Sequence, residues 1–445
     1  MNIGIIGSGI AGLSAGYLAK HNGCQVTIFE SYPKRGMDAN TLELENGGVV
    51  DIPLRIMNEN AWVNVLSMAA HLGVETYRVR TGLSFSDMEG NTNLVTGSVG
   101  IGNVFFPYVP PRYLTQKNFS IISQIFRLRK ETDHLETKVS GNGNGHHSQT
   151  TVEEYFTKNA YTPEFWKGFL LPILSTICTC KESHLLVWPA HDLLLLVNRL
   201  IHGSYSKRFR GGTKKLVDAL SKGIEFKSGV RVGQIQQLNP ANSTNPSNLT
   251  NPIIQTSSTH QPNSVSVKLE SGEEYFFDRV IVATQANQTG FLDKSQFATE
   301  LELLSGFPYD EGELVTHVDS TLLPKRKSDW SPINYRRDPI SSETEFTVWV
   351  NPVEKSIQKD VNIFQTWNPK APIRQELILS KLVLQRAIVK NTNFAFLKKL
   401  DDMLLDPNRR VYFSGSYSFA GVPLLESAVR SSMRIAKSLD WKVPW

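Results

Sequence analysis

A glycine-rich turn at the start of the chain constrains the fold more than any other feature of the sequence. The apolar run 3–6 is followed at once by GSGIAG and then by a stretch rich in small residues. The segment 25–29 is typical of a second buried strand and ends in Glu30. This order predicts a buried strand, a tight turn, a helix packed closely on that strand and a second parallel strand. It is typical of the start of an α/β domain.

Each glycine of this turn has its own physical purpose. Gly7 permits the sharp change of direction after the strand, and Gly9 lets the backbone approach a phosphate without a Cβ in between. Gly12 lets the helix pack on the strand, and the free N–H groups at the helix start attract the charge of a phosphate. Glu30 is placed to accept hydrogen bonds from a ribose and would repel a 2′-phosphate. The pattern predicts a dinucleotide site for NAD or FAD and disfavours NADP.

The residues that follow Glu30 favour FAD. The segments 30–37 (ESYPKRGM) and 47–51 (GGVVD) resemble the corresponding part of FAD enzymes of the flavin amine oxidase, phytoene desaturase and protoporphyrinogen oxidase superfamily. The strand-like run 277–284 and the closing motif 411–430 extend the resemblance. It is nearest to a subgroup of FAD/NAD(P)-binding oxidoreductases often encoded beside cyclopropane fatty acid synthases. Two departures are Met37 in place of a glycine and the sequence IPLRI at 52–56.

The resemblance implies an α/β fold with a Rossmann-type FAD-binding domain (glutathione-reductase-like, amine oxidase type) and an inserted α+β substrate domain. The FAD domain would comprise residues 1–70, 205–300 and 405–445, and the substrate domain residues 71–204 and 301–404. The polar segment 239–264 is predicted to be a disordered loop between strands at 230–238 and 264–269. Pro423 is predicted to lie in the first turn of the closing helix.

Noncovalent FAD is the cofactor that the resemblance implies. No cysteine stands shortly before Gly415, where some relatives tether the flavin. In such relatives the start of the closing helix faces the flavin pyrimidine, where its dipole stabilises negative charge. The residues implied to contact the cofactor are Gly7, Ser8, Gly9, Ile10, Ala11, Gly12, Glu30, Ser31, Gly36, Met37, Leu54, Arg55, Ile56, Val230, Ala283, Gly415, Ser416, Leu424 and Leu425.

The implied reaction is transfer of a hydride between a substrate C–H and flavin N5, as an oxidation, a desaturation or an isomerisation. Amine-oxidising relatives place a lysine near N5, but the corresponding stretch 313–319 (ELVTHVD) has none, so amine oxidation is the less favoured alternative. His317 is the candidate catalytic residue, although a single histidine is more often structural. Tyr335, Trp349 and Tyr417 are candidates for an aromatic wall by the flavin, and we expect at least two of them to belong to the core.

The substrate class is predicted from what the sequence contains and lacks. Long apolar stretches at 165–177 and 185–200, without an acidic cluster to attract an amine, favour a small hydrophobic substrate of the acyl-lipid or isoprenoid kind. A non-catalytic FAD- or NAD-binding module and an NAD-dependent dehydrogenase are the alternatives from other classes.

The charge and the cysteine content of the sequence bear on its partners, its location and its metal sites. Lys plus Arg number 47 and Asp plus Glu 42, a net charge of +5 without a dense basic run, so no nucleic-acid partner is expected. The basic cluster 127–130 would permit peripheral contact with a membrane. The sequence contains only Cys24, Cys178 and Cys180 and shows no signal peptide or transmembrane run, so a cytoplasmic location is expected. No metal site is predicted, and the oligomeric state stays open.

Overall fold

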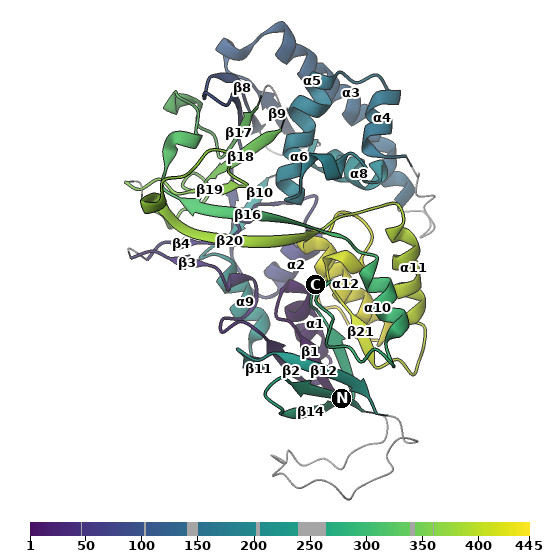
Figure 1. Cartoon of the computed structure of the whole chain (residues 1–445). Helices are drawn as coiled ribbons and strands as arrows, with labels where there is room; N and C mark the ends of the chain where they lie inside the picture. Colours follow the sequence, from purple (N-terminus) through teal and green to yellow (C-terminus); the bar gives the residue numbers. More distant parts are fainter. Residues whose placement is uncertain are drawn as a thin grey trace, which may run out of the picture.

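A five-stranded parallel sheet forms the lower part of the molecule (Figure 1). The computed structural model describes residues 1–45, 47–101, 104–139, 150–201, 205–238, 264–338, 343–358 and 360–445. In spatial order the strands are β11 (Glu225–Ser228), β2 (Gln25–Glu30), β1 (Asn2–Ile6), β15 (Arg279–Val282) and β21 (Val411–Phe413). All neighbouring pairs are parallel. The nearly continuous apolar runs of β1 and β2 are buried on both faces, as helices covering a parallel sheet require.

The order of these strands confirms the fold predicted from the first turn and from the returning strand. The run that contains β15 was predicted to return to the nucleotide-binding domain, and β15 pairs with β1 from Ile3 to Ile6. The sheet therefore combines segments from the start, the middle and the end of the sequence. The predicted domain boundaries themselves stay a prediction.

Two helices, α1 (Ile10–His21) and α12 (Leu425–Ser438), pack against each other beside this sheet. The Ser432 hydroxyl donates to the carbonyl oxygen of Ala11 at 2.8 Å, which joins the first turn of α1 to the middle of α12. The predicted position of Pro423 in the first turn of α12 is wrong. Leu424 has an extended backbone (φ −106°, ψ −178°), so the helix begins only at Leu425 and Pro423 lies in the preceding loop.

A small antiparallel sheet lies beside the parallel one and consists of β12 (Val232–Gln237), β13 (Val265–Leu269) and β14 (Glu274–Phe277). β12 pairs antiparallel with β13, so the two strands predicted at 230–238 and 264–269 do form a hairpin. The loop predicted to be disordered, 239–264, lies outside the described residues except for Ser264.

A mixed eight-stranded sheet occupies the middle and upper part of the molecule (Figure 1). Its order is β20 (Ile378–Ala387), β16 (Tyr309–His317), β19 (Phe364–Trp367), β18 (Thr344–Trp349), β17 (Ile333–Arg337), β7 (Leu83–Asp87), β8 (Thr92–Ile101) and β9 (Val104–Tyr108). β16 and β20 pair over the full length of β16 and form two long ribbons across the molecule. Short strands β5 (Met57–Asn58), β10 (Ser206–Phe209) and β6 (Thr76–Val79) form a third sheet. A two-stranded ribbon of β3 (Leu42–Glu43) and β4 (Val49–Val50) precedes it in the chain.

One group of helices lies in the upper part of the molecule, beside the eight-stranded sheet (Figure 1). The upper group is α3 (Gln116–Val139), α4 (Val152–Lys158), α5 (Pro163–Phe165), α6 (Leu171–Cys178), α7 (Glu182–Leu185) and α8 (Ala190–Ile201). The lower group comprises α2 (Val63–His71), α9 (Thr213–Ser221), α10 (Ala298–Ser305) and α11 (Asn393–Met403). In the described residues no helix is both long enough and apolar enough to cross a bilayer.

The apolar stretches 165–177 and 185–200 mainly build the core of the upper part. Phe165, Leu174, Trp188 and Leu193 are almost completely buried in one hydrophobic cluster. Cys178 and Cys180 are buried there as well, and burial raises the pKa of both thiols. The interpretation of this pair as buried thiols is therefore confirmed. In the described part of the chain no His, Cys, Asp and Glu side chains gather in a group that could hold a metal ion.

Candidate functional site

The turn between β1 and α1 contains three glycines with three different surroundings. Gly7 has a φ of +99°, which side chains rarely tolerate. A Cβ on Gly12 would overlap the carbonyl oxygen of Gly7. Gly9 has an ordinary backbone (φ −62°, ψ 177°), is exposed, and would place a Cβ where no other atom lies within 4 Å. Local structure thus explains Gly7 and Gly12, whereas nothing within the described chain requires a glycine at position 9.

Glu30, at the end of β2, is held against this turn. Its Oε2 accepts hydrogen bonds from the backbone N–H and the hydroxyl of Ser8, at 2.9 and 2.6 Å. Its Oε1 accepts from the N–H of Tyr32 at 2.9 Å and from the Ser31 hydroxyl at 3.3 Å. The Ser8 hydroxyl in turn accepts from the N–H of Gly36 at 2.7 Å. These bonds fix the carboxylate at the carboxyl edge of the sheet, where ligands of such sheets bind.

Two further predicted residues from distant parts of the sequence lie beside the same turn. The N–H of Val230 donates to the carbonyl oxygen of Glu30 at 3.0 Å. A Cβ added to Gly7 would lie 3.1 Å from the carbonyl oxygen of Ala283. The structure therefore brings together the predicted residues of the first turn, those at 30–37, Val230 and Ala283. Their contacts with a cofactor stay a prediction.

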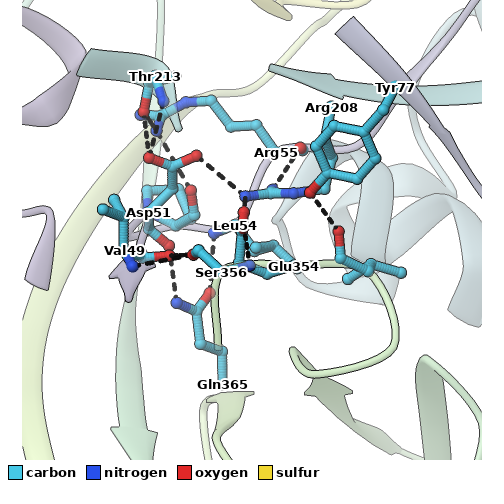
Figure 2. A network of polar contacts seen from close by, with 12 residues as sticks. Val49, Asp51, Leu54, Arg55, Tyr77, Arg208, Thr213, Glu354, Ser356 and Gln365 are labelled. Atoms are coloured by element: carbon cyan, nitrogen blue, oxygen red, sulfur yellow. Dashed lines mark hydrogen bonds and ion pairs between the residues drawn. The ribbon is translucent and has the colours of Figure 1, made fainter. Parts of the chain in front are cut away.

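The predicted residues Leu54, Arg55 and Ile56 lie in a loop between β4 and β5 that a polar network fixes to the eight-stranded sheet (Figure 2). Gln365 of β19 accepts from the N–H of Leu54 at 2.8 Å and donates to the carbonyl oxygen of Asp51 at 2.8 Å. The Ile52–Pro53 peptide within the loop is cis. This loop is therefore positioned by the sheet that also contains the candidate catalytic residue.

Arg208 is the buried centre of that network (Figure 2). Its side chain is 1% exposed and pairs with Asp51 at 3.2 Å and with Glu354 at 2.5 Å, both 2% exposed. It also donates to the carbonyl oxygen of Arg55 at 2.8 Å. Asp51 accepts at its other oxygen from the N–H of Thr213 at 2.9 Å. The ion pairs of Arg208 hold three distant chain segments together, while its Nε has no hydrogen-bond partner among the described residues.

The closing motif joins β21 to α12, whose middle packs against the start of α1. The N–H of Gly415 donates to the Ser431 hydroxyl at 3.0 Å, which fixes the loop after β21 to α12. Leu424, the residue before α12, is only partly buried, and no side chain caps the helix from that position. Gly9, the residue before α1, likewise provides no side-chain cap. Glu426 accepts from the N–H groups of Asn64 and Val65 and so joins α12 to the start of α2.

His317, at the end of β16, is completely buried within the eight-stranded sheet. Its Nε2 lies 2.8 Å from the Thr366 hydroxyl, which lies 2.8 Å from the Thr347 hydroxyl. Burial lowers the pKa of His317 to about 4 against the opposing attraction of Asp319, so the ring is neutral at physiological pH. These contacts are those of a structural histidine, and its catalytic role stays a prediction.

The three aromatic candidates do not form one wall. Tyr335 stacks on Phe85 with ring centroids 4.6 Å apart, and Tyr417 packs on Phe307 at 5.3 Å, in two different hydrophobic clusters. Trp349 is partly buried and contacts a third cluster. The expectation that at least two of these residues belong to the core is confirmed.

Sequence reasoning missed Arg208, Arg386 and Asp192. The only signal for Asp192 was its place as an acid inside an apolar stretch. Asp192 lies beside a small cavity of about 20 Å³, which Ser416 and Gly421 of the closing motif also line. Burial raises its pKa to about 6, and its Oδ2 has no hydrogen-bond partner among the described residues. Arg386 is on β20, and no local pattern marks it.

Comparisons with known proteins agree with this geometry. Residues 5–72 match the family described as the NAD(P)-binding Rossmann-like domain. The sequence matches no curated protein. Among solved structures, putrescine oxidase bound to putrescine is similar with a TM-score of 0.64 at 13% identity, covering 99% of each chain.

Two further solved structures are similar over nearly the whole chain. A CLA-producing fatty acid isomerase from P. acnes has a TM-score of 0.63 at 13% identity, with 98% of this chain and 97% of that chain covered. An oxidoreductase from Methanosarcina mazei has a TM-score of 0.62 at 11% identity, with 98% and 100% covered. The predicted fold class is therefore confirmed, and the resemblance to the amine oxidase superfamily holds at the level of the fold.

Proposed function

We propose that the chain is an FAD-dependent oxidoreductase that moves a hydride between a C–H bond of a hydrophobic substrate and N5 of the flavin. The observation that carries this proposal is the open space at Gly9. Packing and backbone geometry do not account for a glycine there, but a pyrophosphate lying against the backbone does, since any Cβ would intrude on it.

The groups around Gly9 fit a bound dinucleotide. The free N–H groups at the start of α1 would hold the pyrophosphate, and the carboxylate of Glu30 would accept hydrogen bonds from the ribose. A second uncapped helix start is that of α12, a helix that packs against α1, and it would stabilise negative charge on the flavin pyrimidine. This second helix favours FAD over NAD, because a nicotinamide carries no such charge. When bound, FAD supplies the hydride-accepting N5.

A hydrophobic, acyl-lipid or isoprenoid substrate is proposed over an amine. The strand β16 contains no lysine, and its buried His317 is neutral. The likeness to a fatty acid isomerase agrees with an acyl substrate, whereas the equal likeness to putrescine oxidase keeps amine oxidation as the alternative. A non-catalytic flavin-binding module and an NAD-dependent dehydrogenase are the remaining alternatives.

The visible spectrum of the purified protein tests the cofactor. We expect a yellow protein that releases FAD on denaturation and leaves the chain colourless. A colourless preparation that cannot be reconstituted with FAD but binds NADH would instead support a dehydrogenase.

Anaerobic mixing tests the reaction class. The oxidised holoprotein is mixed with unsaturated or methyl-branched acyl lipids and, separately, with primary amines and polyamines. Loss of the long-wavelength flavin band, or a moved double bond in the recovered lipid, supports the proposal. Rapid bleaching by an amine, with all lipids inert, contradicts it, and a flavin that nothing bleaches supports a binding module.

A further inference from the structure

Two arginines that lie where the sheets meet have no acidic partner within ion-pair distance among the described residues. Arg55 is in the loop between β4 and β5, and Arg386 is near the end of β20. Both are partly buried. Their guanidinium groups donate only to neutral oxygens. Arg55 donates to the carbonyl of Pro53 at 3.3 Å and to the hydroxyl of Thr213 at 3.4 Å. Arg386 donates to the hydroxyl of Thr179 at 2.7 Å and, weakly, to the carbonyl of Gln385.

The positive charges in this region repel one another. Burial, with a smaller contribution from the charge of Arg55, lowers the pKa of Arg386 to about 10. Burial also lowers the pKa of Arg55, and the charge of Arg208 contributes to that shift, against the attraction of Asp51. The two guanidinium groups are therefore within electrostatic reach of each other. Neither has a carboxylate within ion-pair distance among the described residues, although Asp51 attracts Arg55 from farther away.

Three of the acidic side chains nearby are engaged elsewhere, whereas Asp38, which attracts Arg55, has an Oδ1 without a hydrogen-bond partner among the described residues. Asp51 accepts from Arg208 and Thr213, and Glu354 pairs with Arg208 (Figure 2). Asp310 lies opposite Arg386 in the ladder of β16 and β20, but its carboxylate accepts from the N–H of Lys181 and contacts His184, each at 3.0 Å.

Both arginines lie on segments that join the two large sheets at the carboxyl edge of the parallel one. The N–H of Leu54, beside Arg55, donates to Gln365 of the eight-stranded sheet. The carbonyl of Gln385, beside Arg386, accepts from Gln285, which follows β15. β15 ends where Ala283 faces the glycine turn. A ligand that reaches from the parallel sheet towards the eight-stranded sheet passes this junction.

We propose that Arg55 and Arg386 together bind an oxyanion, a carboxylate or a phosphate, at the polar end of the organic substrate. The proposal deepens the proposed function and rests on it, because it assigns the space beside the loop 53–56 to a substrate. The planar guanidinium groups of two arginines can each offer paired N–H donors to such an oxyanion. A diamine, the kind of molecule bound by the structurally similar putrescine oxidase, would meet like charge here.

The test compares decyl compounds that differ only in their polar end. Isothermal titration calorimetry measures binding of decanoate, decyl phosphate, decanol and decylamine to the flavin-loaded protein. We expect one or both anions to bind at least about tenfold more tightly than decanol, the range for hydrogen bonds to a charged group. Decylamine is expected to bind more weakly than decanol. Which anion binds better distinguishes a carboxylate substrate from a phosphate.

Three variants test whether the two arginines cause the preference for the anions. Arg386→Gln and Arg55→Gln should each remove most of the preference for the anion, and Arg386→Lys should restore part of it. Arg210→Gln is the matched control, because Arg210 is 62% exposed and pairs with the exposed Glu75. It should bind all four compounds as the wild type does. If one glutamine variant fails to fold, the other and Arg386→Lys still measure the preference.

Each outcome either supports or overturns the proposal. Equal binding of the anions and decanol by flavin-loaded wild type overturns the anion site but leaves hydride transfer untouched. Loss of FAD from Arg386→Gln, with the anion preference kept, assigns these arginines to the cofactor and also overturns it. A flavin-free protein that prefers the anions, and loses this preference in Arg386→Gln, supports the anion site while contradicting the proposed oxidoreductase.

Discussion

The substitution Gly9→Val tests whether this glycine is needed to bind a ligand, whereas Gly12 is needed for the fold itself. At position 9 the backbone is ordinary, and no heavy atom lies within 4 Å of an added Cβ. The fold should therefore lose no more than about 1 kcal/mol, the cost of a poor residue at a helix start. At Gly12 the added Cβ would overlap the carbonyl oxygen of Gly7, so Gly12→Val should destabilise the protein by several kcal/mol.

The effect on the cofactor should be the reverse of the effect on stability. The valine side chain would occupy the space of the pyrophosphate and keep it from the N–H groups of α1. We expect Gly9→Val to lose at least about 100-fold in FAD affinity, or about 2.7 kcal/mol. FAD affinity is measured by fluorescence during reconstitution of the apoprotein, and stability by urea unfolding of the same apoprotein.

Gly290→Val is the matched control. Gly290 is also exposed, has no positive φ and has no atom within 4 Å of an added Cβ, but it precedes the segment 291–292 that lies beside Ile235 of β12. It should keep both stability and FAD. If Gly9→Val binds FAD as tightly as Gly290→Val does, the pyrophosphate does not lie at this turn. If Gly9→Val instead unfolds as readily as Gly12→Val, the glycine serves the fold and the reasoning fails.

Three other substitutions test the site and its support. Glu30→Ala should weaken FAD binding by about 1.5–3 kcal/mol in the same reconstitution assay, and undiminished affinity would refute the ribose contact. Arg208→Met leaves two carboxylates buried and unpaired, so urea unfolding should show a loss of about 3–5 kcal/mol. His317 has a lowered pKa of about 4 against 6.5, so the stability that its neutral form provides is present above pH 6.5 and lost as pH falls towards 4. The free energy of unfolding of the wild type relative to His317→Gln should drop by about 3 kcal/mol across that window, and a flat difference would show that His317 is not buried neutral.

Local patterns in the sequence predicted the nucleotide-binding half of the fold well. The strand, turn, helix and second strand are adjacent in the sequence, and the glycines and Glu30 specify their geometry. The predicted return of the chain beside β1 was also right, since β15 contains three consecutive β-branched residues, 280–282. Pro423 was misplaced because a proline that suits a first turn suits the preceding loop equally well.

The polar network and the unpaired arginines could not be predicted in this way. Arg208 meets Asp51 and Glu354 only because three distant segments converge, and an arginine on a strand gives no sign of its partners in advance. The same holds for Arg386. The sequence does not indicate that this arginine has no carboxylate within ion-pair distance among the described residues. Periodicity reports which face of an element is buried, but not which charges meet across the core.

The sign of the charge at the junction of the sheets, rather than the fold, separates the two substrate classes. The same fold is shared with a putrescine oxidase and with a fatty acid isomerase at equal identity, so the fold alone favours neither. An ammonium substrate needs a carboxylate or an electron-rich ring nearby, because desolvating an unpaired charge is costly. Here Asp51, Glu354 and Asp310 already have partners, while Arg55 and Arg386 have no carboxylate within ion-pair distance among the described residues. A substrate that brings its own negative charge would relieve this repulsion, and one that brings a positive charge would increase it. The electrostatics therefore favour an acidic amphiphile over an amine.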